Sequence, residues 1–151
     1  MTRIEEQIEI AASSSDVFRL CHDIAKRPLW DERVGRIELI SPAPIRSGTL
    51  IQVDARRGSN YFGWEGEYAV FKYPLNSTVK VLDAAVSSPF KAGEEQWTFS
   101  KLSDGTRLSL VWEYEPRNII YRILDVLGGR AGTRAAIRRS LSKLKQLIES
   151  D

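Results

Sequence analysis

Through most of the first 116 residues, large apolar side chains alternate with polar ones. Between Arg3 and Ile10 three isoleucines share one side and glutamates share the other, a two-residue period that predicts a half-buried strand. Clusters of Gly, Pro, Asn and Ser separate six further runs rich in β-branched and aromatic residues. These runs are 35–40, 49–55, 61–71, 78–84, 94–101 and 106–114. The pattern predicts seven strands, the last six forming an antiparallel meander.

Helical periods flank this meander on both sides. Ser13 and Asp16 resemble a capping box ahead of a short helix, and Pro28 starts or interrupts a second short helix that carries Trp30. After Pro116 the helical period continues almost to the end of the chain. It forms one stripe of Ile120, Leu124 and Leu127 and a second stripe of Ile137, Leu141, Leu144 and Ile148.

The two stripes differ in phase by roughly 80°, and Gly128, Gly129 and Gly132 lie between them. We therefore predict a long C-terminal helix that bends or briefly breaks at these glycines. Either the glycines relieve crowding where the helix crosses the sheet, or they form a hinge that lets 119–127 move as a lid.

The stretch "WTFSKLSDGTRLSLVW" predicts a hairpin. Asp104 and Gly105 suit the central positions of a type I′ turn, and a two-residue loop there would place Trp97 opposite Trp112. One face would then carry Trp97, Phe99, Leu108, Leu110, Trp112 and Tyr114, with Glu95 on the same side. These aromatic side chains either fill a core or line a cavity.

The preceding strand, 61–71, has an ambiguous alternation, which a bulge near Gly63 or Gly66 would explain. We place Phe62 and Trp64 on the inner face. The carboxylate pairs Glu65–Glu67 and Glu113–Glu115 would each be about 7 Å apart along a strand. Such pairs serve solubility or acid–base chemistry; Glu65, with Tyr114 or Arg56, is the better candidate for orienting the polar group of a ligand.

Composition indicates one globular domain over residues 1–151, with 42% apolar and 28% charged residues. The single cysteine, Cys21, cannot form an internal disulfide, so a reducing compartment is expected. The N-terminus lacks the continuous apolar stretch of a secretory signal, and no apolar run is long enough to span a bilayer. We expect a cytoplasmic location.

The charge is uneven along the chain. The net charge is +2, but residues 117–151 hold eight basic and three acidic residues. Arg130, Arg134 and Arg138 recur every fourth residue, which is typical of a solvated helix face and would also suit contact with an anionic membrane. That helix has no interleaved aromatic residues, so we expect no nucleic-acid binding.

No catalytic or metal-binding constellation can be assembled from the nucleophiles and ligands present. His22 is the only histidine, and it adjoins Cys21 on a predicted helix, where neighbouring side chains point about 100° apart. A Ser-His-Asp triad and a zinc site would both require this one histidine. We predict no catalytic residue, no metal and no cofactor.

The order of these elements resembles the START-like superfamily, also called SRPBCC, and more narrowly its polyketide cyclase/dehydrase and lipid-transport family. The resemblance is carried by "IEIAASSSDVFRLCHDI", "RPLWDERVGRIELI" with Trp30, "DGTRLSLVWEYEP" and "LSKLKQLIE", and it covers nearly the whole chain. It implies an α+β helix-grip fold, in which a curved antiparallel sheet wraps around the long C-terminal helix. It also implies a hydrophobic cavity between them, in which members bind lipids, sterols, polyketides or other apolar metabolites.

We therefore expect a binding protein that encloses a small hydrophobic molecule, such as a lipid, a polyketide or an isoprenoid-like compound. The expected cavity residues are Phe62, Trp64, Trp97, Phe99, Leu108, Leu110, Trp112 and Tyr114, with Ile120, Leu124 and Leu127 as the lid. Tyr114 would supply one polar contact. The alternatives are a cyclase/dehydrase-type enzyme acting on a polyketide and an interaction module that uses the basic helix. We expect a monomer or a weak dimer.

Overall fold

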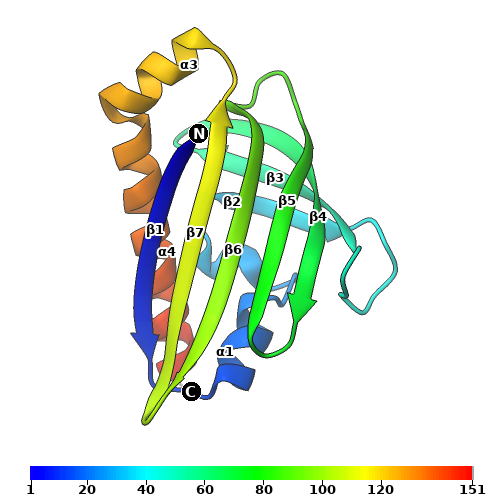
Figure 1. Cartoon of the computed structure of the whole chain (residues 1–151), viewed down its shortest axis with the longest axis vertical. Coiled ribbons are helices and arrows are strands. Elements are labelled where there is room, and N and C mark those ends of the chain that lie inside the picture. Colours follow the sequence, from blue (N-terminus) through cyan, green and yellow to red (C-terminus); the bar gives the residue numbers. More distant parts are fainter. Residues whose placement is uncertain (151) are drawn as a thin grey trace.

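A single curved antiparallel sheet dominates the computed structural model, which describes residues 1–150. Within that range seven strands pair in the order β1-β7-β6-β5-β4-β3-β2, so only β1 is out of sequential order. The strands are β1 (Thr2–Ile10), β2 (Val34–Leu39), β3 (Leu50–Arg57), β4 (Asn60–Lys72), β5 (Asn76–Ala84), β6 (Phe90–Leu102) and β7 (Gly105–Pro116). Figure 1 shows β1, β7 and β6 as long neighbouring strands beside the C-terminal helix.

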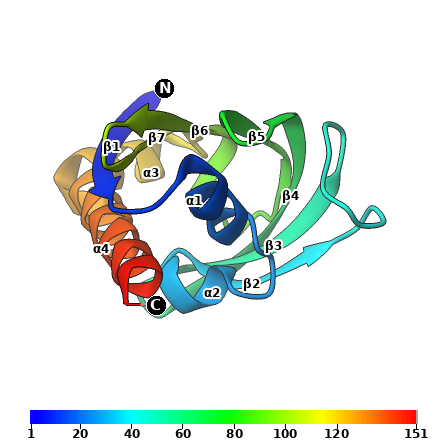
Figure 2. The ribbon, with the colours of Figure 1, turned by 90° about the horizontal axis from the view of Figure 1, so that it is seen from below.

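The helices close the open side and one end of this half-barrel. They are α1 (Ser14–Cys21), α2 (Arg27–Trp30), α3 (Ile119–Leu124), a π-helical turn η1 (Asp125–Gly129) and α4 (Arg130–Glu149). Figure 2 shows the sheet curving around the interior, with α4 along its open side and α1 and α2 across the lower end. The predicted α+β helix-grip architecture is confirmed. No helix up to Ser150 is long and apolar enough to cross a bilayer.

The local signals that predicted the helices are present in the structure. The Ser13 hydroxyl accepts a hydrogen bond from the Asp16 backbone N–H, which satisfies one of the free donors at the start of α1. Pro28 lies in the first turn of α2, where its missing N–H costs nothing. In the C-terminal helix, Gly128 has φ 156° and ψ −20°, so the predicted break falls at this glycine.

The register of the β6–β7 hairpin differs from the prediction. Leu102 pairs with Gly105, Trp97 with Leu110 and Glu95 with Trp112, so Trp97 does not lie opposite Trp112. The turn is built on Ser103 and Asp104 and has no positive φ, so it is not the type I′ turn that Asp-Gly favours. Gly105 instead belongs to β7, at a place where a Cβ would collide with the Ile10 carbonyl oxygen. Because the shift is two residues, every side chain keeps its predicted face.

The pairing of β4 with β5 is irregular at two places. Pairing with β5 shifts between Glu65 and Gly66, near the predicted bulge, and again between Tyr68 and Val70. Phe62, Trp64 and Tyr68 face inward before the second shift, and after it Phe71 lies inward, 5.5 Å from the Tyr68 ring centroid. The second irregularity, rather than the one near Gly66, switches the face.

Buried side chains fill the half of the interior nearest α1 and α2. The Trp30 and Trp97 rings meet edge to face with centroids 6.1 Å apart, and Phe18 lies 4.9 Å from Phe99. α4 adds Ile137, Leu141 and Leu144 to this core. The other half of the sheet, toward the start of β6 and the end of β7, encloses a cavity.

Candidate functional site

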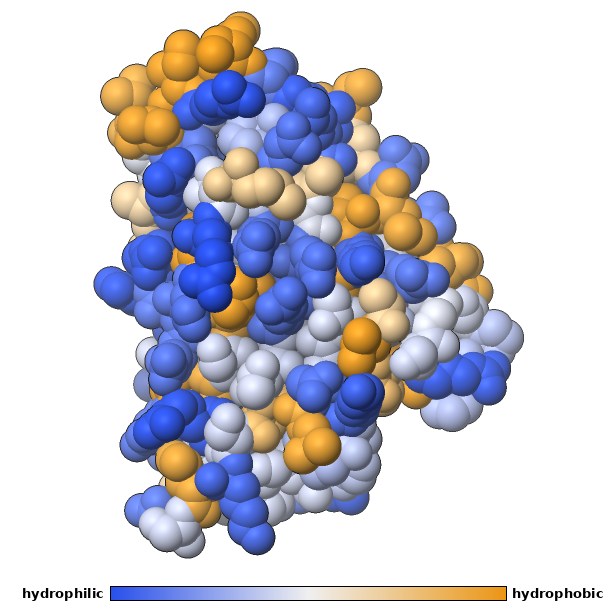
Figure 3. Space-filling model, viewed as in Figure 1, coloured by the Kyte–Doolittle hydropathy of each residue, from blue (hydrophilic) through white to orange (hydrophobic). Residues whose placement is uncertain are grey.

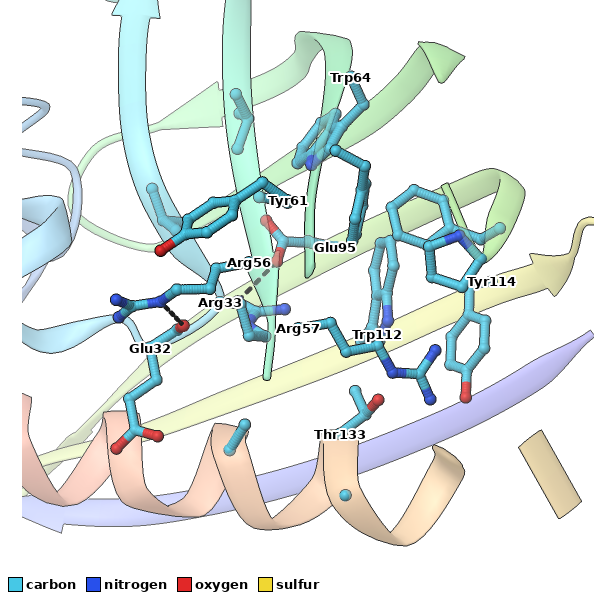
Figure 4. A pocket seen from close by; sticks show the side chains of 18 of the residues that line it. Glu32, Arg33, Arg56, Arg57, Tyr61, Trp64, Glu95, Trp112, Tyr114 and Thr133 are labelled. Carbon is cyan, nitrogen blue, oxygen red and sulfur yellow. Dashed lines mark hydrogen bonds and ion pairs between the residues drawn. The ribbon is translucent and has the colours of Figure 1, made fainter. Parts of the chain in front are cut away.

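The cavity has a volume of about 850 Å³ and lies between the concave face of the sheet and the first turns of α4. Strands β2, β3, β4, β6 and β7 provide its walls, and the glycines of η1 and α4 border it on the helix side. Pockets of roughly 300–1,000 Å³ accommodate small organic ligands. Figure 4 shows Trp64, Trp112 and Tyr114 on one side of the space, with Arg57 reaching toward Tyr114 and Thr133.

Aromatic rings in mutual contact form the apolar wall. Phe90 lies 5.4 Å from Phe62 and 5.3 Å from Trp112, both edge to face, and Trp112 stacks on Tyr114 at 5.5 Å. These are favourable aromatic geometries. The rings therefore hold one another in place and leave a preformed surface facing the cavity.

Two glycines let the tryptophans of this wall lie close to the sheet. A Cβ at Gly93 would come within 2.5 Å of the Trp112 ring, and one at Gly66 within 2.6 Å of the Trp64 ring. Any larger residue at either position would push an indole toward the cavity. The open volume therefore depends on both glycines.

Four charged residues form a compact network at the inner end of the cavity. Arg27 Nε donates to Asp31 Oδ2 at 2.8 Å, and the Arg33 guanidinium contacts Asp31 at 3.1 Å and Glu95 Oε2 at 2.8 Å. Arg27 Nη2 lies 3.7 Å from Glu95 Oε1. The formal charges balance, as a buried ionic cluster requires. Arg27, Arg33 and Glu95 line the cavity, whereas Asp31 lies behind them; Figure 4 marks the Arg33–Glu95 pair.

The arginines keep Asp31 ionised inside the protein. Burial alone would raise the pKa of this carboxyl, but the Arg33 and Arg27 guanidiniums beside it lower the pKa well below its usual range. Arg27 also lies over the rings of Trp30 and Trp97, at 5.1 and 5.2 Å from their centroids, which adds cation–π stabilisation. The network is thus a rigid part of the fold as well as a wall of the cavity.

Tyr68 adds an unused hydrogen-bond donor to this inner end. Its side chain is fully buried and lines the cavity, and its hydroxyl has no hydrogen-bond partner among residues 1–150. Burial raises the pKa of Tyr68 to about 12, so the hydroxyl keeps its proton near neutral pH. Buried polar groups in proteins are nearly always hydrogen-bonded, so an unpaired hydroxyl at this position is unusual.

The Tyr114 hydroxyl, in contrast, is already engaged. It donates to Asp125 of η1, which also accepts from the Thr2 hydroxyl at 2.8 Å and from Arg130 at 3.0 Å. Burial and the bond to Asp125 raise the pKa of Tyr114 above its usual range. The expected polar contact from Tyr114 to a ligand is therefore replaced by an anchor that holds η1 against β7 and β1.

The structure brings together only part of the predicted cavity set. Phe62, Trp64, Trp112 and Tyr114 line the cavity. Trp97, Phe99, Leu108 and Leu110 are buried in the filled half and do not line it. Ile120, Leu124 and Leu127 are 64%, 51% and 77% exposed, and they form no lid over the tryptophans. In the segment 119–127 only Asp125 is buried, because its bonds hold η1 with the apolar side chains outward.

Other candidates from the sequence also lie outside the cavity lining. Glu65, Glu67, Glu113 and Glu115 do not line it, and the last two pair with Arg3 and Lys91. Arg134 and Arg138 both contact Glu6, at 2.9 and 2.6 Å, and Arg130 contacts Asp125. Each arginine of the basic stripe therefore has a carboxylate partner within the fold, with Arg134 and Arg138 sharing Glu6.

His22 is a structural core residue. Its Nδ1–H donates to the Phe18 carbonyl at 2.9 Å, so Nε2 accepts from the Ser77 hydroxyl at 2.7 Å. Burial lowers the pKa of the imidazole to about 3, and burial raises the pKa of the Cys21 thiol. No cluster of three metal-ligating side chains occurs in the described part of the chain.

Comparisons with known proteins give the family of the chain and agree with the fold. The family model described as polyketide cyclase / dehydrase and lipid transport matches residues 1–149. A comparison with curated proteins found no match. Protein TTHA0849 from Thermus thermophilus has a similar structure, with a TM-score of 0.82, 18% identity, and coverage of 99% of this chain and 100% of that one.

Two further solved structures share the fold. A START superfamily protein from Mycobacterium smegmatis has a TM-score of 0.77 at 14% identity, covering 96% of this chain and 98% of that one. The Zhui aromatase/cyclase from Streptomyces sp. R1128 has a TM-score of 0.73 at 11% identity, covering 97% and 95%. At these identities the likeness establishes the fold alone.

Proposed function

Because the chain belongs to the polyketide cyclase / dehydrase and lipid transport family, we propose that it binds a small, largely apolar molecule carrying a neutral oxygen. The molecule would lie between the sheet and α4, with that oxygen at the inner end of the cavity. The observation that carries the proposal concerns Tyr68, which is one of the residues lining the cavity and whose buried hydroxyl has no partner among residues 1–150.

A comparison of the free energies of binding supports a role for the Tyr68 hydroxyl contact. A ligand that buries about 400 Å² of apolar surface gains about 10 kcal/mol at ~25 cal/mol per Å². Association costs about 4–15 kcal/mol, so apolar contact alone gives weak to moderate affinity. Leaving a buried hydroxyl unpaired costs about 1–3 kcal/mol, and a ligand oxygen that accepts from Tyr68 recovers this amount.

The charge balance beside Tyr68 favours a neutral ligand oxygen over a carboxylate. Arg33 already pairs with Glu95 and Asp31, so a ligand anion would have to displace one of these carboxylates. A ketone, hydroxyl or phenol oxygen can accept from Tyr68 without breaking an ion pair. The ligand class is therefore ketones, alcohols and phenols with an extended apolar body.

A matched pair of ligands tests the proposal. Displacement of the fluorescent probe 1-aminoanthracene by 2-naphthol and by 2-methylnaphthalene compares a hydroxyl with a methyl group of similar size. We expect the wild type to prefer 2-naphthol by about ten-fold, the equivalent of one buried hydrogen bond. In Tyr68→Phe the preference should vanish while the methyl compound still binds.

Tyr61→Phe is the matched control, because Tyr61 lines the outer part of the cavity with its side chain largely exposed. Tyr68→Phe should also be at least as stable as the wild type, since it removes an unsatisfied buried hydroxyl. A preference for 2-naphthol that survives in a folded Tyr68→Phe protein would contradict the proposed polar contact.

A second candidate is catalysis of the cyclase/dehydrase kind. It is favoured by one observation, the presence of Arg27, Arg33, Glu95 and Tyr68 in the cavity wall. Donation from Tyr68 would polarise a ketone, and a carboxylate could accept a proton from the adjacent carbon as a new carbon–carbon bond forms. Liquid chromatography with mass spectrometry of a poly-ketone incubated with the wild type and with Glu95→Gln would reveal cyclised products by changed retention at unchanged mass and dehydrated products by the loss of water. The absence of any product excludes this activity for that substrate.

A further inference from the structure

The segment 119–127, which comprises α3 and most of η1, exposes an unusual set of apolar side chains. Six of its nine residues are large, apolar and more than half exposed: Ile119, Ile120, Ile123, Leu124, Val126 and Leu127. Figure 3 shows hydrophobic residues gathered over α3 at one end of the molecule. We call this set the α3 patch. Apolar side chains exposed together mark an interaction surface.

The fold holds the α3 patch outward. Asn118 caps α3 by accepting from the Tyr121 backbone N–H at 3.0 Å. At the other end, Asp125 is buried and bonded to Thr2, Tyr114 and Arg130. A helix this short is unstable in isolation, so these bonds fix both its presence and its orientation. The apolar side chains of the α3 patch are therefore held outward and do not pack against the rest of the protein.

The charges beside the patch are positive. Arg122 is exposed within the segment, and the Arg57 guanidinium approaches Gly129 at the end of η1. Neither arginine takes part in an ion pair among residues 1–150. Asp125, the acidic residue of the segment, is buried and paired. The patch therefore presents apolar side chains and one exposed, unpaired cation, Arg122, while Arg57 lies half-buried at the adjoining edge of the cavity.

The patch also adjoins the cavity. Gly128 and Gly129 follow directly after Leu127 and line the cavity, as do Arg57 and Gly58 of the β3–β4 turn. A molecule leaving a surface in contact with the patch would reach the cavity along this edge.

We propose that the α3 patch docks on the surface of an anionic phospholipid bilayer. The isoleucine and leucine side chains enter the interface between head groups and acyl chains, and Arg122 contacts lipid phosphates and carboxylates. A second copy of the chain fits less well, because a two-fold contact through the patch brings its own arginines together. This docking surface differs from the stripe of Arg130, Arg134 and Arg138, whose charges are paired within the fold.

Flotation of the full chain with vesicles tests the proposal. We expect binding to vesicles of phosphatidylcholine and phosphatidylserine in equal parts, weakened by salt, and much weaker binding to phosphatidylcholine alone. The double variant Ile120→Ser/Leu127→Ser should reduce binding by about ten-fold or more. Arg122→Gln should reduce it by about five-fold.

Leu75→Ser and Lys72→Gln are matched controls. Both residues are exposed in or beside the β4–β5 turn, away from the patch, and their vesicle binding should equal that of the wild type. Displacement of 1-aminoanthracene should be unchanged in Ile120→Ser/Leu127→Ser, because neither residue lines the cavity. Vesicle binding can therefore be absent while the cavity still binds the probe, and probe binding can be absent while the protein still binds vesicles.

Equal binding to vesicles with and without phosphatidylserine would overturn the proposal. Full vesicle binding by the double variant would overturn it as well. So would a concentration-dependent dimer in sedimentation velocity that Ile120→Ser/Leu127→Ser abolishes, in a protein that binds no vesicles. That last result would assign the α3 patch to self-association.

Discussion

Most of the buried polar residues have hydrogen-bond or ion-pair partners within the fold, but not all of them do. Arg27, Asp31, Arg33 and Glu95 satisfy one another, and His22 is bonded at both ring nitrogens. Tyr68 has no such partner among residues 1–150. The indole N–H of Trp30 is also unpaired within that range, but Trp30 does not line the cavity, so function at this scale rests on Tyr68.

The buried His22 predicts a pH dependence of stability. The folded ring has its pKa lowered to about 3, whereas the unfolded ring titrates near 6.5. Below that unfolded value, the unfolded chain binds a proton that the folded protein does not. The free energy of unfolding should therefore be fully retained above about pH 6.5 and fall by up to about 1.4 kcal/mol per pH unit as the pH drops toward 3.

Urea unfolding between about pH 7 and pH 4.5 measures this slope, before most carboxylates titrate. The chain has one histidine, so His22→Asn, which keeps a donor near the Nδ1 position, should flatten the slope in this window. Equal slopes in the wild type and the variant would show that His22 titrates normally.

Some of these residues carried a signal in the sequence and others did not. Glu95 shares the parity of Trp97 and Phe99 on its strand, and a carboxylate on an apolar face indicates a buried partner or a site. Arg27 and Asp31 lie in a short helical stretch with no such alternation. They are buried because α2 packs against the sheet, and a local hydrophobic period does not predict that packing.

Among the secondary-structure elements, the broken C-terminal helix has the clearest functional consequence. The break separates α4, whose apolar face packs on the sheet, from α3, whose apolar face remains exposed. The phase difference between the two apolar stripes predicted the break. It did not predict that the first stripe would face away from the cavity, because the direction after a break depends on the non-helical φ of Gly128 and on the bonds of Asp125.

Two nearby glycines should respond oppositely to alanine. Gly128 has φ +156°, which an alanine adopts only with strain, so Gly128→Ala should lower the free energy of unfolding by about 1 kcal/mol or more. Gly132 lies within α4, and outside its own turns of helix backbone no atom lies within 4 Å of a Cβ placed there. Gly132→Ala should raise stability by about 0.5–1 kcal/mol. Thermal or urea unfolding of the two variants checks the prediction, and equal signs would contradict the assigned break.

Across the whole molecule, one continuous sheet serves two purposes. α1 and α2 fill the interior at one end, where Trp97 packs on Trp30, and the other end remains hollow beside Trp112. The residues of the β6–β7 hairpin are thus core at one end and cavity wall at the other.

The two hairpin tryptophans should therefore give different phenotypes. Trp97→Ala should lower the free energy of unfolding by about 3–5 kcal/mol, as expected for a large core residue. Trp112→Ala should cost less, because one side of its ring borders the cavity, and it should weaken 1-aminoanthracene binding. Urea unfolding and probe titration measure the two effects. The assignment would be contradicted if Trp112→Ala lost more stability than Trp97→Ala and still bound the probe. The packed core would then lie at the end of Trp112.

The sequence by itself determined the elements, their order and, apart from the irregular end of β4, the face on which the strand side chains lie. These features depend on local periods, turn residues and caps, and they survive a two-residue change of register because side chains alternate with a period of two. The sequence also indicated the helix-grip architecture through the order of elements. Only the tertiary structure decided which part of the inner face is filled, that Arg27 and Tyr68 border the same cavity as Glu95, and that 119–127 faces outward. Those outcomes depend on the packing of segments distant in the chain, and on hydrogen bonds such as that from Tyr114 to Asp125, which local patterns do not contain.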